Sequence, residues 1–313
     1  METFENEETI QQPSILPKPV VVEDRKNWVR KSIISLGIYA LLFIFLFDAS
    51  IAYVAAVLVA LIIHEFGHFF AMKAFNYSNV KLFVLPLLGA YVTGKKSVIS
   101  QRQMTVVILA GPVPGILIGM GLHFLNMNYP NERLEMLRNI FLILNLFNLL
   151  PFVPLDGGRL VETLFSAKNH IIKMVFTIIS ILFLVLLAIN SKSVFFIVVP
   201  IAMIFDLIME FKNQKIRTYL NQENINFTTN YEDLPDSDYW TIRDCILLAF
   251  NKRYSGVEAG VHKYSAIEGS LIQHVTSILK QPFQKDLGVI GIILTVISYI
   301  GIWVAALYVF IQG

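Results

Sequence analysis

The chain has 313 residues, of which 55% are hydrophobic and 15% are charged, and its mean hydropathy is +0.62. This composition excludes an ordinary soluble domain and indicates a protein with several membrane-spanning segments. The net charge of +2 does not point to nucleic acid as a partner, and the single cysteine, Cys245, excludes both an internal disulfide and a zinc cage built of thiolates.

The chain begins with a polar stretch and continues as a series of apolar runs. Residues 1–31 are polar, acidic and proline-bearing, so we expect a disordered cytosolic tail there. Seven apolar runs of spanning or near-spanning length predict seven transmembrane helices, six of them in a core over 32–211. The runs cover about 32–47, 50–73, 104–125, 137–155, 171–190, 194–211 and 287–311.

A shorter apolar piece lies between the second and third runs. Within 79–98, the stretch Leu82–Val92 is too short to span a membrane, and Pro86 and Gly89 interrupt it. This pattern predicts a re-entrant or membrane-edge β-hairpin, with an ordinary interfacial loop as the alternative.

The polar stretch 212–286 separates the sixth run from the C-terminal run in 287–313. Within it, Tyr239–Tyr254 and Ala266–Leu279 carry apolar residues at every third or fourth position, which predicts two amphipathic helices. We expect a small cytosolic helical unit here, followed by one last transmembrane helix.

The distribution of lysine and arginine predicts the orientation. With the N-terminus in the cytosol and seven spans, all but three of the 25 basic residues fall on the cytosolic side, the exceptions being Arg133, Arg138 and Lys192. Basic residues concentrate on the cytosolic side of membrane proteins, so the bias favours a cytosolic N-terminus and an outside C-terminus.

The second apolar run contains the sequence His64-Glu65-Phe66-Gly67-His68. Two histidines four positions apart project from one face of a helix and can bind one zinc ion, while the glutamate between them can act on a zinc-bound water. The pattern is weak evidence alone, because two ordinary histidines inside a helix bundle would give the same spacing.

Asp156 is a candidate third zinc ligand at the end of the fourth apolar run. A carboxylate inside a spanning segment is costly and marks a functional site, and the adjacent Gly157 permits a tight backbone turn. The fourth run is expected to be a helix that enters from the outer face at about residue 138, and helical rise then places Asp156 and the two histidines at the same depth, roughly 21–27 Å from that face.

These residues together resemble the site-2 protease family of intramembrane zinc metalloproteases. The resemblance covers roughly residues 50–190 and rests on the stretch His64–His68 and on the pattern Asn148-x-x-Pro151-x-x-Pro154-Leu155-Asp156-Gly157. It implies zinc ligands at His64, His68 and Asp156 and a catalytic base at Glu65.

Four further positions are expected to support the site: Gly89, Gly111, Gly115 and Asn148. The stretch from Gly111 to Gly115 is similar to a GxxxN/S/G motif of the family in its glycine form. With Gly119 it makes a spacing of four that favours helix packing over substrate contact. Asn148 can contact either a neighbouring helix or the substrate backbone. Gly89 lies in the segment that matches the family's membrane-embedded hairpin.

The sequence therefore predicts an all-α polytopic protein of a prokaryotic plasma membrane. The expected function is zinc-dependent hydrolysis of peptide bonds in or near the transmembrane helices of single-span or other helical membrane proteins, with no nucleic-acid partner. Two alternatives stay open: a membrane-anchored zincin acting on cytosolic protein, and a catalytically silent scaffold or ion-binding protein.

Overall fold

The computed structural model describes residues 16–20, 28–47, 50–85, 89–166, 170–191 and 195–312. The chain divides into two compact units. The core unit comprises Asp24–Leu207 and Phe283–Gly313, and the α9–α10 unit comprises Met1–Glu23 and Ile208–Pro282.

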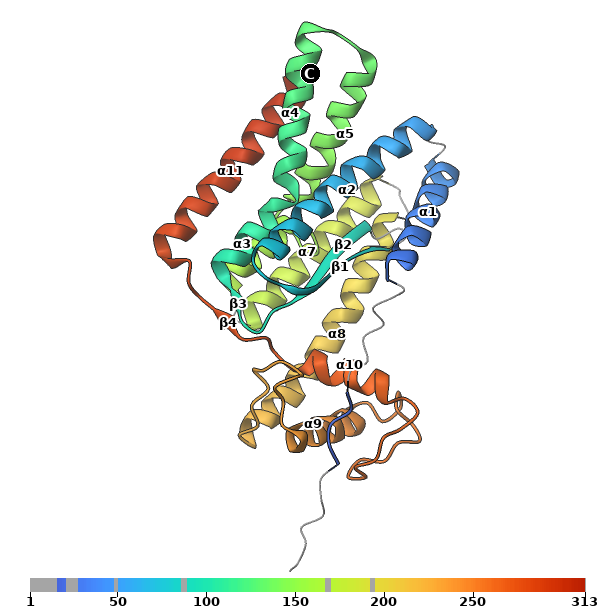
Figure 1. Cartoon of the computed structure of the whole chain (residues 1–313), viewed down its shortest axis with the longest axis vertical. Coiled ribbons are helices and arrows are strands. Elements are labelled where there is room, and N and C mark those ends of the chain that lie inside the picture. The colour runs from blue at the N-terminus through green and yellow to red at the C-terminus, as the bar shows by residue number, and fades with distance from the viewer. Residues whose placement is uncertain are drawn as a thin grey trace, which may run out of the picture. The chain divides into compact units, whose positions relative to one another are not determined.

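Helices make up most of the core unit (Figure 1). In chain order they are α1 (Trp28–Phe47), α2 (Ile51–Ala74), α3 (Gln101–Ala110), α4 (Pro112–Asn128), α5 (Glu132–Asn148), α6 (Asp156–Val161), a π-helical turn η1 (Glu162–Ser166), α7 (His170–Ser191), α8 (Phe195–Gln222), which continues into the other unit, and α11 (Gly288–Gln312).

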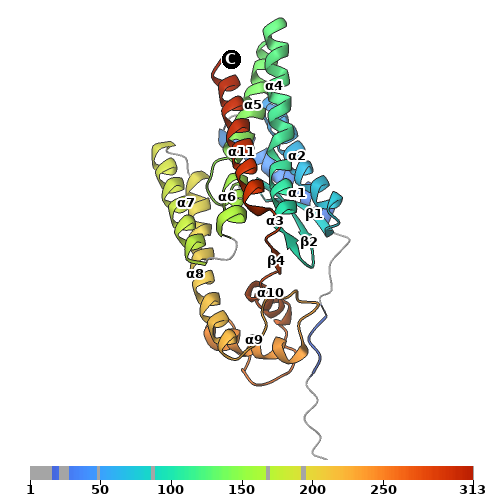
Figure 2. The same cartoon turned by 90° about the vertical axis from the view of Figure 1, so that its left-hand side faces the viewer.

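Three of these helices, α4, α5 and α11, lie side by side in both views (Figures 1 and 2). Apolar side chains from all three form their common core, as Ile116, Leu142 and Ala306 are almost fully buried there. Among the described residues, four helical segments are long and apolar enough to cross a membrane: Ile51–Ala74, Gln101–Asn128 (α3 and α4 together), Ile171–Asn190 and Gly288–Gln312.

The fourth predicted helix is shorter than its apolar run. It is α5, and it ends at Asn148 rather than at 155, because Pro151 and Pro154 cannot donate the backbone hydrogen bonds that would extend it. Asp156 instead begins a separate helix, α6, after a turn. The prediction that placed Asp156 by helical rise along one continuous helix was therefore wrong.

A two-stranded antiparallel hairpin follows α2. Strand β1 (Ser78–Leu85) pairs with β2 (Gly89–Lys95), and the rings of Phe83 and Tyr91 stack across the pair at 5.5 Å. The Ser32 hydroxyl of α1 donates to the Leu82 carbonyl at 2.7 Å, which places α1 beside β1. Pro86, which was expected to interrupt this apolar stretch, lies outside the described residues.

A second, parallel ladder joins segments far apart in sequence. Strand β3 (Ile99–Ser100) pairs with β4 (Phe283–Gln284), and Asp286 accepts hydrogen bonds from the Ser100 hydroxyl and the Arg102 backbone N–H. No local pattern predicted this pairing, so the expectation of a purely helical chain with one hairpin was incomplete.

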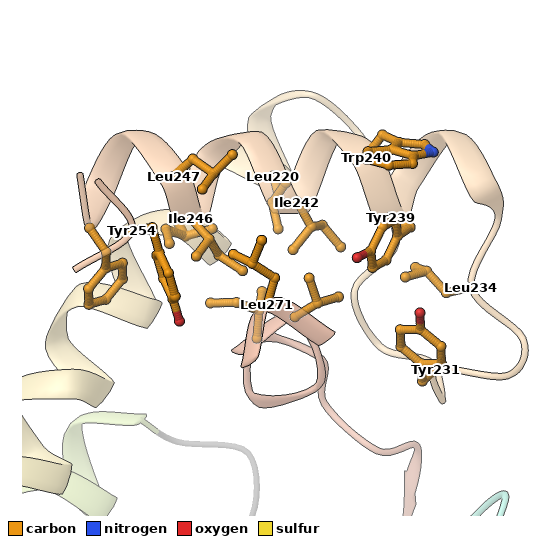
Figure 3. Close-up of a cluster of buried hydrophobic side chains, with 14 residues drawn as sticks. Leu220, Tyr231, Leu234, Tyr239, Trp240, Ile242, Ile246, Leu247, Tyr254 and Leu271 are labelled. Carbon is orange, nitrogen blue, oxygen red and sulfur yellow. The ribbon is translucent and has the colours of Figure 1, made fainter. Parts of the chain in front are cut away.

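The α9–α10 unit has its own hydrophobic core (Figure 3). Helix α9 (Asp236–Ala249) directs Ile242 and Ile246 toward Leu271 of α10 (Glu268–Ile278), and all three side chains are fully buried. The 3–4 spacing of apolar residues in the sequence predicted both helices, and their apolar faces pack on each other.

A buried ion pair links the two helices. The Arg243 guanidinium of α9 donates to Oε1 of Glu268 at 3.0 Å, and the Tyr239 hydroxyl donates to the same oxygen at 2.5 Å. The Ser265 N–H and hydroxyl donate to Oε2 at 2.9 Å each. Because both carboxylate oxygens have donors, the buried charge of Glu268 is well compensated.

Candidate metal centre

Helix α2 places both motif histidines on one buried face. The Ser50 hydroxyl caps the start of this helix by accepting from the Tyr53 N–H, and the apolar run then continues without a breaker. His64 and His68 are 3% and 7% exposed, and their rings lie edge to face at 4.9 Å between centroids. The HExxH spacing thus gives the expected pair of imidazoles one helical turn apart.

Asp156 reaches the same point from another element. Its Oδ2 lies 3.0 Å from Nε2 of His64 and 3.2 Å from Nε2 of His68, and the two Nε2 atoms lie 3.2 Å apart. The three side chains are buried and could together hold a metal ion. The structure therefore brings together the three predicted ligands, although they come from positions 88 residues apart.

The turn before Asp156 is held from two sides. The Tyr299 hydroxyl of α11 donates to the Leu149 carbonyl, and the Ser180 hydroxyl of α7 accepts from the Val153 N–H at 3.0 Å. A Cβ atom on Gly157 would come closer than 3.0 Å to the Leu149 carbonyl. Glycine is needed at 157 because the turn and the start of α6 are in backbone contact.

Hydrogen bonds to the Nδ1 atoms determine the tautomers of both histidines. Nδ1 of His64 lies 2.8 Å from Oδ1 of Asn145, whose amide nitrogen donates to the Phe141 carbonyl at 2.7 Å. Nδ1 of His68 lies 2.8 Å from the Val107 carbonyl. Both partners are acceptors, so each Nδ1 carries the proton and each Nε2 presents a lone pair.

Three acceptor atoms therefore face one another without a proton between them. Two Nε2 lone pairs and one carboxylate oxygen at 3.0–3.2 Å would repel, unless a cation lies among them. Tetrahedral zinc with bonds of about 2.0–2.1 Å requires donor atoms roughly 3.3 Å apart. The separations, the N/O chemistry and the outer hydrogen bonds all fit a zinc site with one coordination position left open.

Glu65 lies beside this group and is not one of the three convergent donors. Its side chain is 5% exposed, and its Oε2 is buried without a hydrogen-bond partner among the described residues. A buried carboxylate oxygen without a donor is costly, which is typical of a group that acts on a bound reactant. The expected base is therefore adjacent to the expected ligands.

Two glycines, one between α3 and α4 and one in the first turn of α4, lie close to the site. A Cβ atom on Gly111 would come closer than 3.0 Å to the His68 ring, and one on Gly115 would come equally close to the Asn145 amide. On the other side, Gly67 of the histidine motif lies against the backbone of Ala110. The glycines permit close helix contact at the metal centre, as a small-residue packing face does.

Two of the predicted supporting residues are not the hydrogen-bond partners of the two histidines. The Asn148 amide donates to the Leu144 carbonyl of its own helix at 3.1 Å, and Gly89 pairs with Leu85 at the start of β2. The residue that orients His64 is Asn145, which sequence reasoning missed. Its one signal in the sequence was a polar residue within the apolar stretch 140–147, three positions before Asn148.

Comparisons with known proteins agree with this geometry. Residues 52–132 match the family model described as peptidase family M50. Over these residues the chain is similar to that peptidase family. The match contains His64, Glu65 and His68, whereas Asn145 and Asp156 lie beyond it, so the roles assigned to these two residues rest on geometry.

Two curated relatives are similar to part of this chain. It is 31% identical over 142 residues to a zinc metalloprotease of Methanocaldococcus jannaschii and 30% identical over 110 residues to a putative zinc metalloprotease of Synechocystis sp.. The alignments cover 43% and 34% of this chain but only 37% and 29% of those relatives.

One solved structure also matches. It is the site-2 protease from Methanocaldococcus jannaschii, at 23% identity and a TM-score of 0.44. The alignment covers 56% of this chain and 86% of that one.

Proposed function

We propose that the chain is a zinc-dependent endopeptidase of the membrane that hydrolyses peptide bonds in or near transmembrane helices. The observation that carries the proposal is the convergence of His64 Nε2, His68 Nε2 and Asp156 Oδ2, with the unpartnered Oε2 of Glu65 beside them. The family match and the names of the two curated relatives support the same chemistry.

In this proposal the three ligands hold zinc, which when bound supplies Lewis-acid activation of water and of the scissile carbonyl. Glu65 accepts a proton on Oε2 as the water oxygen bonds to the carbonyl carbon. The same oxygen then delivers the proton to the amide nitrogen as the C–N bond breaks. The buried Glu65 can do this because none of the described residues donates a hydrogen bond to Oε2.

The membrane setting is part of the proposal. Four described helices are apolar enough to span, and α1, α5 and α8 occupy the remaining three predicted runs. With seven spans and a cytosolic N-terminus, Arg133, Arg138 and Lys192 are the only basic residues outside. Water would then reach the site from the cytosolic side of a prokaryotic plasma membrane.

A helical substrate must unwind before attack, since a helix shields its own carbonyls. Unwinding in lipid leaves N–H and C=O groups unpaired at a cost of several kcal/mol each. Strand β2 could compensate by pairing with the unwound segment. Support comes from the arrangement of the hairpin, in which β1 already lies between β2 and the Ser32 hydroxyl of α1.

Two alternatives predict different results. A membrane-anchored zincin would cut soluble cytosolic protein. The burial of Asp156 directly after the apolar run that ends at Leu155 speaks against it. A silent scaffold would bind an ion without hydrolysis, and the unpartnered Oε2 of Glu65 speaks against that.

The test uses purified full-length protein reconstituted into lipid vesicles with a single-span reporter. We expect about one zinc per chain in the wild type and in Glu65→Gln, and loss of zinc in His64→Ala and Asp156→Ala. Activity should be lost in all three variants. Mass spectrometry of the products gives the position of the cut relative to the span.

Each outcome separates the candidates. Cleavage outside the span, in a cytosolic loop, would favour the anchored zincin. An active Glu65→Gln variant would remove Glu65 from the proposed chemistry. Stoichiometric zinc in an inactive wild type, against several single-span reporters, would favour the scaffold.

A further inference from the structure

Five residues of the predicted N-terminal tail, Leu16–Val20, lie against the 208–282 part of the α9–α10 unit. The rest of the tail before α1, residues 1–15 and 21–27, lies outside the described residues. The five residues read Leu-Pro-Lys-Pro-Val. They come almost 200 residues before Ile208, where the rest of the unit begins, and nothing in the proposed proteolysis uses them.

The two prolines favour an extended backbone in this segment. Proline fixes its own φ near −65°, and it also drives the residue before it toward extended conformations. Pro17 and Pro19 therefore restrict Leu16 and Lys18 as well as themselves. Such a segment favours the polyproline II conformation, whose backbone carbonyls are free to accept hydrogen bonds.

Three aromatic side chains of the unit donate to the carbonyls of this segment. The Trp240 indole N–H donates to the Leu16 carbonyl at 2.6 Å. The Tyr264 and Tyr231 hydroxyls each donate at 2.7 Å, to the carbonyls of Pro17 and Pro19 respectively. Recognition of an extended proline-containing backbone by an aromatic-lined surface is an established binding mode.

Lys18 is the most closely held residue of the segment. Its ammonium group donates to three backbone carbonyls, those of Tyr231 and Glu232 at 2.8 Å and that of Leu234. The ammonium also lies 5.4 Å from the centre of the Tyr231 ring. Three donors on one nitrogen meet three acceptors, a geometry that suits lysine and not the planar fork of arginine.

The backbone of Lys18 is held as well, since its N–H donates to Oδ1 of Asp236 at 2.9 Å. Asp236 is the first residue of α9, where a carboxylate also favours the helix N-terminus. The α9–α10 unit therefore contacts two features of the segment, the backbone N–H of the residue between the prolines and the ammonium group of the same residue.

Trp240 forms the wall of the site. In Figure 3 it lies along the side of α9 away from Leu271, yet it is only 1% exposed. The rings of His262 and Tyr264 stack on it at 5.1 and 6.0 Å, and the Arg243 guanidinium lies 5.0 Å from its centre. The ion pair of Arg243 with Glu268 fixes this wall in place.

We propose that the α9–α10 unit is a recognition site for an extended peptide with lysine between two prolines, and that this chain's own Leu16–Val20 segment is its resident ligand. The lysine supplies specificity through its three carbonyl partners, and the prolines supply an extended shape. A tethered ligand occupies the site at an effective concentration of order millimolar, so peptide from another molecule must compete with it.

The first experiment uses a shortened protein, residues 24–313, and measures how tightly it binds a fluorescent peptide that covers residues 13–22. We expect saturable binding in detergent micelles, weakened at least tenfold in peptides with Lys18→Ala or Lys18→Arg. A Pro17→Ala/Pro19→Ala peptide should bind several-fold more weakly. If the Lys18→Arg peptide binds as the wild-type peptide does, the site reads only charge, and the proposal fails.

The second experiment changes the protein side without disturbing its core. Tyr264→Phe removes one hydroxyl from a half-exposed side chain, so we expect several-fold weaker binding of the wild-type peptide. The matched control is Tyr219→Phe, an equally exposed tyrosine of the same unit whose hydroxyl makes no bond to the segment. Equal binding by the two variants would overturn the proposed contact.

The third experiment tests occupancy by the chain's own segment. Full-length wild-type protein should bind the labelled peptide at least tenfold more weakly than the variant that lacks residues 1–23. Lys18→Ala in the full-length chain should restore binding, whereas Lys26→Ala in the same tail should not. Equal affinity of the full-length and shortened proteins would show that the site is empty in the intact chain, against the proposal.

Discussion

The side-chain oxygen of Asn145 lies 2.8 Å from Nδ1 of His64, and the same amide group fits against Gly115. One side chain on α5 therefore links the ligand-bearing helix α2 to the glycine face of α4. Outer partners of this kind fix the tautomer and the ring orientation of a metal-binding histidine.

Replacing Asn145 should weaken metal binding without removing a ligand. In Asn145→Leu the packing volume is similar, but Nδ1 of His64 loses its acceptor, so we expect zinc affinity to fall about 10- to 100-fold. Competition with a chelator measures the change. The matched control is Asn148→Ala on the same helix, because the Asn148 amide donates to the Leu144 carbonyl of its own helix, and this variant should retain zinc. Equal losses in both variants would contradict the assignment.

The glycine face offers a second test within a single helix. In Gly115→Ala the added methyl would overlap the Asn145 amide, so we expect weaker zinc binding and a loss of stability of about 1–3 kcal/mol. Gly121→Ala, on the same helix, adds its methyl to open space and should leave zinc binding unchanged. Thermal unfolding and zinc content in detergent measure both effects. If the Gly115→Ala variant keeps the wild-type zinc content and unfolding temperature, the helices can move apart without weakening the site.

The hairpin can be tested through one residue of β2. Tyr91→Pro removes a backbone N–H, whereas Tyr91→Ala removes only the ring stacked on Phe83. If β2 pairs with an unwound substrate, the proline variant should lose more activity on a helical reporter than on one that is already extended. The alanine variant should affect both reporters alike. Equal loss on both reporters in the proline variant would argue against strand pairing.

Stability of the α9–α10 unit should depend on His274. Burial, and after it the charge of Arg253, lowers the pKa of His274 to about 4. Nε2 lies 3.2 Å from Oδ1 of Asn213 and Nδ1 lies 2.9 Å from the Tyr254 hydroxyl, so the neutral ring is fully paired. Its surroundings include the Phe250 ring at 4.4 Å.

The sign of the effect follows from proton binding. The unfolded chain binds a proton at a pKa of about 6.5, while the folded unit resists protonation until about pH 4. Stability should therefore fall as the pH drops through this window, by at most about 1.4 kcal/mol per pH unit. Hydrogen exchange of α10 between about pH 7 and about pH 5 measures it. His274→Gln should flatten the dependence, and His262→Gln, on an exposed ring, should not.

Local patterns in the sequence were sufficient to single out most helices and the three side chains that converge in the structure. The HExxH spacing identified His64 and His68 because both lie on one helix, and the carboxylate of Asp156 stood out in an apolar run. The 3–4 spacing in α9 and α10 identified those helices for the same reason, since periodicity is a property of a single segment.

Features that depend on contacts between distant segments could not be predicted in this way. The pairing of β3 with β4, the bond from Tyr299 to Leu149 and the role of Asn145 each join elements that are far apart in sequence. The turn before Asp156 shows the same limit, because the prolines mark the end of a helix but not the direction that the chain takes afterwards.

The close fit of Gly67, Gly111 and Gly157 has a consequence for interpreting sequence variation. A saturation-mutagenesis screen should find these three glycines about as intolerant as the three ligands, because each lies too close to a neighbouring backbone or ring to accept a methyl group. Loss of function after a substitution at this centre would therefore indicate a lack of space as often as a chemical role of the residue. Zinc content, rather than loss of activity, would distinguish the residues that bind the metal from those that only make room for it.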